Sequence, residues 1–197
     1  MCDVLIVGGG VAGSSLAIML GRSGFAVRLF EKALFPRKKP CGEGLMSSGV
    51  AVLQRGGRDE IVGGCHFHGV RFYFGSGSTL QTRYKTFRFQ SPGLGQRRKV
   101  LDQALITSAA ATPGVQVHIG VRVDGLIRER DTATGLRVAG QEYRAPLGVA
   151  ADGAQSNHSQ TARIERWLQA RTLRRACSFS FGGCKTSSTL GRGVHRE

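Results

Sequence analysis

Three glycines near the N-terminus, Gly8, Gly10 and Gly13, have the spacing Gly-x-Gly-x-x-Gly, which is typical of a turn that binds a pyrophosphate. In that pattern the first glycine permits a tight turn, the second lets the backbone approach the phosphates, and the third lets a helix lie close to a strand. Glu31 follows at the spacing expected of a carboxylate that accepts hydrogen bonds from a ribose. The sequence therefore predicts a dinucleotide site. The alternative is a glycine-rich turn in an unrelated α/β unit, with Glu31 there by chance.

The residues around these glycines predict the elements that position them. Residues 4–7 are apolar, as in a buried parallel strand, residues 14–22 fit a helix, and residues 25–30 fit a second strand that ends at Glu31. The helix begins where the phosphates would lie, so its free N–H groups and the positive end of its dipole favour a negative charge.

The rest of the chain continues this alternation of strands and helices. We predict a basic, cofactor-facing loop at 32–45, with a solvent loop as the alternative, and then a helix at 47–56 capped by Ser47 or Ser48. A half-buried strand at 66–74 and one or two strands at 79–89 precede a helix at 97–106. The remaining predictions are strands at 115–119 and 121–128, a turn at 132–135, a hairpin of 136–138 with 142–144, and a buried parallel strand at 147–151. The last strand delivers Asp152 and Gly153 at its carboxyl end, where ligands bind in open α/β sheets. Arg97 and Arg98 oppose the dipole of the helix that they begin, so they need an anionic ligand or solvent.

Composition excludes several classes of protein. The formal charge of +15 would attract anions, but no basic run is interleaved with stacking aromatics, so specific nucleic-acid binding is not expected. The five cysteines are odd in number and lack metal-ligand spacing, which predicts neither a disulfide framework nor a metal site and favours the cytoplasm. The apolar N-terminus has no basic segment and is interrupted by glycines, so neither a leader peptide nor a transmembrane segment is expected.

Three motifs in this order resemble those of the FAD-dependent oxidoreductases with the hydroxybenzoate-hydroxylase type of fold, which include flavin monooxygenases and geranylgeranyl-reductase-like enzymes. They are the glycine fingerprint through Glu31, the run Arg98-x-x-Leu101-Asp102-x-x-Leu105, and Asp152-Gly153. Residues 41–45, Cys-Gly-Glu-Gly-Leu, look most like the reductase-like branch, in which such a loop approaches the flavin ring. The resemblance runs from residue 3 to about residue 157, which is the N-terminal portion of the family fold.

The resemblance implies an α/β fold: a Rossmann-like, three-layer FAD-binding domain with a small antiparallel β insertion. The expected division is 1–65 for the first part of the FAD-binding domain, 66–95 for the β insertion that starts a substrate domain, 96–157 for the second part, and 158–197 for a basic tail of unassigned structure. FAD is the expected cofactor, with NAD(P)H as a transient reductant. The residues expected to bind FAD are Gly8, Gly10, Val11, Ala12, Gly13, Glu31, Lys32, Cys41, Gly42, Arg98, Val123, Asp152 and Gly153.

The expected function is that of an FAD-binding oxidoreductase, which either hydroxylates a small organic substrate or reduces a carbon–carbon double bond. No side chain has the spacing of a catalytic acid, base or nucleophile. Family members are longer and carry a later Gly-Asp motif, so the sequence predicts that the C-terminal half of the family fold is missing and that the chain is inactive by itself. The alternative is a non-catalytic cofactor-binding remnant or a basic interaction protein. The sequence predicts nothing about the oligomeric state.

Overall fold

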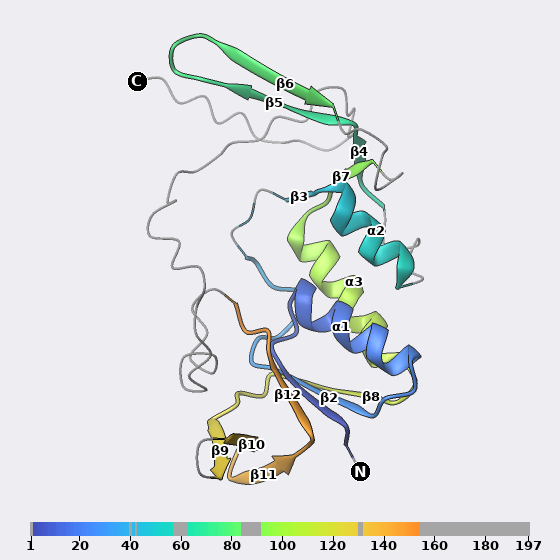
Figure 1. The fold of residues 1–197 in the computed structure, drawn as a ribbon, viewed down its shortest axis with the longest axis vertical. Coiled ribbons are helices and arrows are strands. Elements are labelled where there is room, and N and C mark those ends of the chain that lie inside the picture. The colour runs from blue at the N-terminus through green and yellow to red at the C-terminus, as the bar shows by residue number, and fades with distance from the viewer. Residues whose placement is uncertain are drawn as a thin grey trace.

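A parallel sheet of four strands forms the centre of the molecule (Figure 1). The computed structural model describes residues 2–39, 41, 43–56, 63–83, 92–129 and 132–153 of the 197. The strand order is β12 (Leu147–Ala150), β1 (Val4–Val7), β2 (Val27–Glu31) and β8 (Val115–Ile119), and every neighbouring pair is parallel. The crossover from β1 to β2 is made by helix α1 (Val11–Arg22), as the apolar pattern predicts.

The sheet is covered on both faces, which makes three layers. Helices α1 and α3 (Arg98–Ala110) cover one face, with α2 (Ser47–Arg55) beyond them and away from the sheet (Figure 1). The antiparallel strands β9 (Gly125–Glu129), β10 (Thr132–Val138) and β11 (Gln141–Arg144) lie on the opposite face. Side chains alternate along each strand. Val4 and Ile6 therefore pack against the helices, whereas Leu5 and Val7 pack against the three-stranded layer. The predicted fold class is confirmed.

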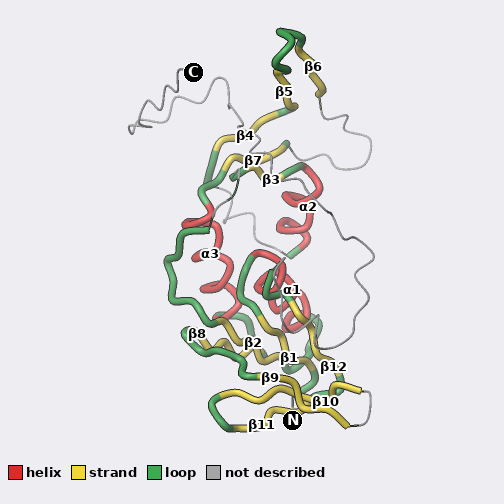
Figure 2. Tube along the Cα trace, turned by 90° about the vertical axis from the view of Figure 1, so that its left-hand side faces the viewer, coloured by secondary structure: helices red, strands yellow, loops and turns green. Residues whose placement is uncertain are grey.

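Small antiparallel sheets lie beyond α2, at the end of the molecule away from β9–β11 (Figure 2). One contains β3 (Gly44–Leu45), β7 (Gly93–Gly95) and β4 (Cys65–Phe67), and the other is a hairpin of β5 (Gly69–Tyr73) and β6 (Thr79–Arg83). This is the predicted antiparallel insertion, although β3 joins it from outside the expected range 66–95. Residues 84–89 of the predicted strand region 79–89 and the tail at 158–197 lie outside the described residues.

Several local predictions are wrong for reasons that short-range patterns do not contain. The turn expected at 132–135 belongs to β10, because residues 132–138 pair with both β9 and β11. The serine cap of α2 is absent, since Met46 is the N-cap residue and makes no side-chain capping bond. Helix α1 begins at Val11, three residues earlier than expected.

Exposure corrects two further strand predictions. The strand at 66–74 is not half-buried throughout, because Phe72 and Phe74 on its predicted buried side are 41% and 51% exposed. Strand β12 is parallel to β1 as expected, but it is an outer strand of the sheet and Leu147 is exposed. The apolar composition of both segments predicts strand formation and does not predict what covers the strand.

Cysteine pairing also differs from the expectation. Cys65 is disulfide-bonded, whereas Cys2 and Cys41 are free thiols. The odd cysteine count therefore did not exclude a disulfide. In the described part of the chain, no group of three or more potential metal ligands comes together, and no helix has the length and apolarity needed to cross a membrane.

Candidate functional site

A cleft of about 860 Å³, its open mouth included, lies at the carboxyl ends of β1, β2 and β12. Five segments distant in sequence meet there. The lining residues are Val7, Gly8, Gly10, Phe30, Glu31, Lys32, Arg37, Lys39, Val121, Arg122, Val123, Asp124, Ala151 and Asp152. Its position is the one at which open parallel sheets bind ligands.

The three glycines of the fingerprint have different surroundings. Gly8 has φ +103°, and a Cβ atom there would lie 2.5 Å from the carbonyl oxygen of Ala151. A Cβ atom on Gly13 would lie 1.9 Å from the carbonyl oxygen of Gly8, so only glycine lets α1 approach the turn this closely. At Gly10, by contrast, the nearest atom is the side-chain nitrogen Nη2 of Arg37, at 3.3 Å. Gly8 and Gly13 are therefore required by packing, whereas Gly10 presents bare backbone to the cleft.

The first turn of α1 leaves backbone donors beside this bare backbone. Gly10 is the N-cap residue and makes no side-chain capping bond, and the amide of Ser14 donates to the carbonyl of Gly10 over 2.9 Å. The amides of Val11, Ala12 and Gly13 precede that first helical bond, so helix geometry gives them no intrahelical acceptor. Such amides and the helix dipole together favour an anion.

Glu31 fixes the glycine turn to the end of β2. Its side chain is almost fully buried, and its two carboxylate oxygens accept backbone hydrogen bonds from Gly9 over 2.7 Å and from Ala33 over 2.8 Å. A carboxylate has about four acceptor positions, so two remain after these bonds. The sequence predicts a ribose acceptor at Glu31 and does not reveal that the same group holds the turn.

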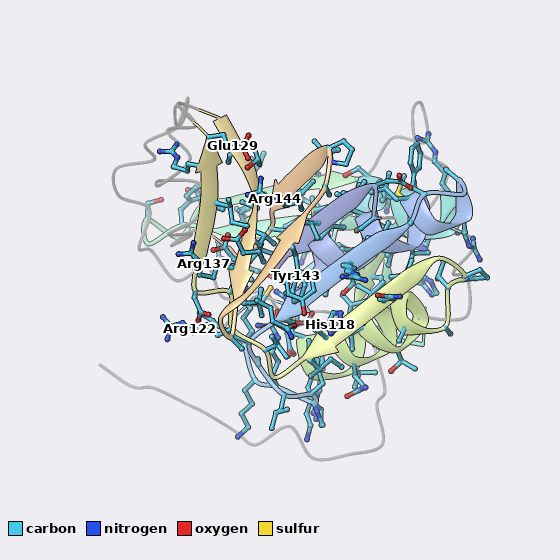
Figure 3. The ribbon with its side chains drawn as sticks, turned by 90° about the horizontal axis from the view of Figure 1, so that it is seen from below. His118, Arg122, Glu129, Arg137, Tyr143 and Arg144 are labelled. Atoms are coloured by element: carbon cyan, nitrogen blue, oxygen red, sulfur yellow. The ribbon has the colours of Figure 1, made fainter. Side chains whose placement is uncertain are left out.

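Cations line the cleft more densely than the motifs indicate. Lys32, Arg37, Lys39 and Arg122 contribute to its wall, and Figure 3 shows Arg122 at the edge of the molecule, in the loop between β8 and β9. Arg37 lies over the ring of Phe35, 5.2 Å from its centroid. Arg37, Lys39 and Arg122 were not predicted as site residues; the signal for the first two was the basic run at 37–39 after the ribose acid.

Arg98 lies outside the cleft lining. It donates to the fully buried Asp102 from Nε over 2.8 Å and from Nη2 over 3.0 Å, and its backbone amide donates to Glu43 over 3.3 Å. The hydrogen bond to Asp102 raises the pKa of Arg98 above its ordinary value, against the opposing effect of burial. The free thiol of Cys41 is the next polar partner of Arg98. Arg98 and Cys41 are therefore neighbours, and neither of them lines the cleft.

Of the predicted site residues, Arg98 and Cys41 lie outside the cleft lining, and Val11, Ala12 and Gly13 form the start of α1 beside Gly10. The cleft itself unites Gly8, Gly10, Glu31, Lys32, Val123 and Asp152. Gly153 follows directly with φ +103°, and Lys39 Nζ is 3.6 Å from its would-be Cβ atom. Gly42 lies outside the described residues.

An aromatic cluster supports the cleft from the side of β11. Phe30, which lines the cleft, stacks on His118 at 4.8 Å between ring centroids and meets the edge of Tyr143 at 5.0 Å. His118 and Tyr143 are neighbours in Figure 3. Burial, and then the charge of Arg28, lowers the pKa of His118 below its ordinary value. The imidazole is therefore kept neutral as a packing group behind the cleft wall.

Comparison with known proteins places this site in a family context. Residues 1–181 match the family model described as "FAD binding domain", a match that extends past residue 157. Squalene monooxygenase of Mus musculus is 34% identical over 164 residues, which cover 77% of this chain and 28% of that protein. Menaquinone reductase of Mycolicibacterium smegmatis is 32% identical over 157 residues, which cover 78% and 38%.

A solved structure is also similar in fold, and it too is longer than this chain. A geranylgeranyl bacteriochlorophyll reductase-like protein from Thermoplasma acidophilum superposes with a TM-score of 0.68 at 26% identity, over 83% of this chain and 42% of that one. The chain therefore spans less than half the length of these relatives.

Proposed function

Because the chain belongs to the FAD-binding domain family, we propose that its cleft holds the ADP half of FAD and that the protein acts as the cofactor-binding part of a flavin-dependent oxidoreductase. The observation that carries this proposal is the convergence of Gly10, Glu31 and Asp152 at one edge of the parallel sheet. FAD itself is the cofactor that the family match indicates.

The residues present fit the adenosine and pyrophosphate groups of this cofactor. Gly10 offers backbone that only the end of the Arg37 side chain approaches, and the amides at the start of α1 favour a pyrophosphate. Glu31 keeps acceptor capacity for a ribose after holding Gly9 and Ala33. Val123, buried in the wall of the same cleft, provides an apolar surface for the adenine.

The reaction proposed for the protein is a flavin-dependent oxidation or reduction of a small organic substrate. When bound, FAD supplies the redox chemistry, while the protein binds and orients it and excludes water. The two relatives named above differ in reaction, one being a monooxygenase and the other a reductase. We therefore propose substrate hydroxylation or double-bond reduction, with NAD(P)H as the transient electron donor, and we assign no catalytic residue. A cytoplasmic location also stays a proposal, and the disulfide at Cys65 weakens the cysteine argument for it.

Titration calorimetry with FAD, ADP and adenosine tests the cofactor site. We expect one site per chain for which FAD and ADP compete, because the proposed contacts are to the part that they share. Loss of this binding in Gly10→Val, with an unchanged circular dichroism spectrum, would support the placement. A folded parent protein that binds neither FAD nor ADP would refute it and would favour a non-catalytic interaction protein.

The type of reaction is tested by the mass of the product. The protein is incubated with FAD, NADPH and a polyprenyl alkene, and the products are separated by mass spectrometry. Hydroxylation or epoxidation adds an oxygen atom, whereas reduction adds a pair of hydrogen atoms. Unchanged alkene together with proven FAD binding would leave the cofactor site intact and refute turnover by residues 1–197.

A further inference from the structure

Asp102 is a buried carboxylate that joins two arginines from separate parts of the chain. It lies on α3 with none of its surface exposed. Arg98, one turn earlier on the same helix, binds both of its oxygens. Arg37, from the loop after β2, places Nη2 3.3 Å from Asp102 Oδ2. A buried charge is tolerated when it is paired in this way, so the arrangement holds both arginines in defined positions.

The position imposed on Arg37 is in the cleft, above the fingerprint. Its Nη2 atom is 3.3 Å from the point where a Cβ atom of Gly10 would lie and 4.0 Å from Glu31 Oε2. The face of its guanidinium covers Phe35. Asp102, Glu31 and the Phe35 ring therefore restrict this side chain on three sides, and its remaining side faces the cleft that it lines.

Arg37 keeps hydrogen-bonding capacity in this position. Nη2 of Arg37 forms the ion pairs with Asp102 and Glu31, whereas Nε has no hydrogen-bond acceptor within the described residues. A guanidinium carries five N–H donors in a planar fork that matches phosphate oxygens. A cation that is already held at the phosphate position loses less side-chain entropy when the ligand binds.

We infer that Asp102 is a positioning residue, which holds the Arg37 guanidinium over Gly10 so that Arg37 contacts the phosphates of the bound cofactor. This inference rests on the proposed cofactor site. It also gives Arg98 a different role from the one implied by the family resemblance: Arg98 neutralises and fixes Asp102 from behind and reaches the ligand only through it.

The test compares ADP with adenosine, because the two differ only in the phosphates. Arg37→Gln should weaken ADP binding about 10- to 100-fold, the range for a lost hydrogen bond to a charged group. Adenosine affinity should stay unchanged. Asp102→Asn should show the same selective loss, about 5- to 30-fold, because Arg37 is released. In the double variant Asp102→Asn should add nothing to the loss from Arg37→Gln, since the first residue acts through the second.

Two further variants keep the test decisive. Glu142→Gln removes the same charge from an acid that is paired with exposed Arg137 and Arg144 and does not line the cleft, so it should leave ADP binding unchanged. If Asp102→Asn does not fold, the double variant Asp102→Asn with Arg98→Gln removes both members of the tight pair and still releases Arg37, so it should show the same ADP-selective loss.

The possible failures are distinguishable. Parental ADP affinity in Arg37→Gln would overturn the inference and leave the cofactor site standing. Equal losses of ADP and adenosine in Asp102→Asn, or additive losses in the double variant, would reduce Asp102 to a structural residue. Failure of the parent protein to bind ADP would instead overturn the proposed function itself.

Discussion

Two glycines of one fingerprint should respond in opposite ways to the same substitution. Gly13→Ala places a methyl group 1.9 Å from the Gly8 carbonyl oxygen, which is backbone and has no alternative rotamer. Gly10→Ala places it 3.3 Å from Arg37 Nη2, which is a side-chain atom and much less close. The first change should therefore damage the fold, and the second should damage the ligand site.

The magnitudes follow from the contacts. Overpacking costs about 1–3 kcal/mol or more, and a methyl carbon 1.9 Å from a backbone oxygen belongs at the upper end of that range, about 3 kcal/mol. Because alanine returns about 1 kcal/mol of helix propensity relative to glycine, Gly13→Ala should lose about 2 kcal/mol of stability. That corresponds to a fall of about 4–8 °C in Tm for a chain of this size. Gly10→Ala, at the N-cap, should cost only about 0.5–1 kcal/mol of stability, which is about 1–4 °C in Tm. The cost is small because Gly10 has extended backbone angles that any residue can adopt.

Thermal unfolding and ADP titration of both variants provide the measurement. Gly10→Ala should weaken ADP about tenfold or more, which corresponds to about 1.4 kcal/mol of crowding at the phosphates. Gly13→Ala, assayed well below its Tm, should bind ADP with an affinity closer to that of the parent than Gly10→Ala does. The reasoning is wrong if Gly13→Ala unfolds at the parental temperature, or if Gly10→Ala binds ADP with parental affinity.

Three other predictions concern the surroundings of the cleft. Glu31→Gln should lower the free energy of unfolding by about 1.5–3 kcal/mol, the worth of a hydrogen bond to a charged group, because an amide can satisfy only one of its two backbone donors; urea unfolding at parental stability would contradict this. The pKa of His118 lies below 6.5 in the folded state, so its stabilising contribution is complete above pH 6.5 and declines as pH falls from 6.5 toward the folded-state pKa. His118→Gln should therefore flatten the fall in Tm between about pH 8 and about pH 5, and an equally steep fall in the variant would disprove the assignment. Arg98→Ala should lower Tm, because it leaves buried Asp102 with Arg37 alone; unchanged Tm with weaker FAD binding would instead support the direct cofactor contact predicted from the sequence.

The sequence by itself determined the elements whose signals are local. The apolar run at 4–7, the glycine spacing and Glu31 lie within one strand–helix–strand unit, so short-range sterics and periodicity define the unit almost completely. The structure has β1, α1 and β2 at those positions, with boundaries shifted by up to three residues. The antiparallel insertion followed from the order of such units, whereas the three layers were expected from the family resemblance.

Only the tertiary structure decided which side chains share the cleft and which strands are exposed. Arg37 looked like one of several cations in a basic loop until Asp102, 65 positions later, fixed its place over Gly10. Arg98 carried the motif yet faces Asp102 instead of the cleft. Burial at β12 and β5 likewise depends on neighbours that an apolar run does not specify. The physical reason is common to all of them: ion pairing and burial are set by groups that are distant in sequence, whereas turns and periodicity are set within a few residues.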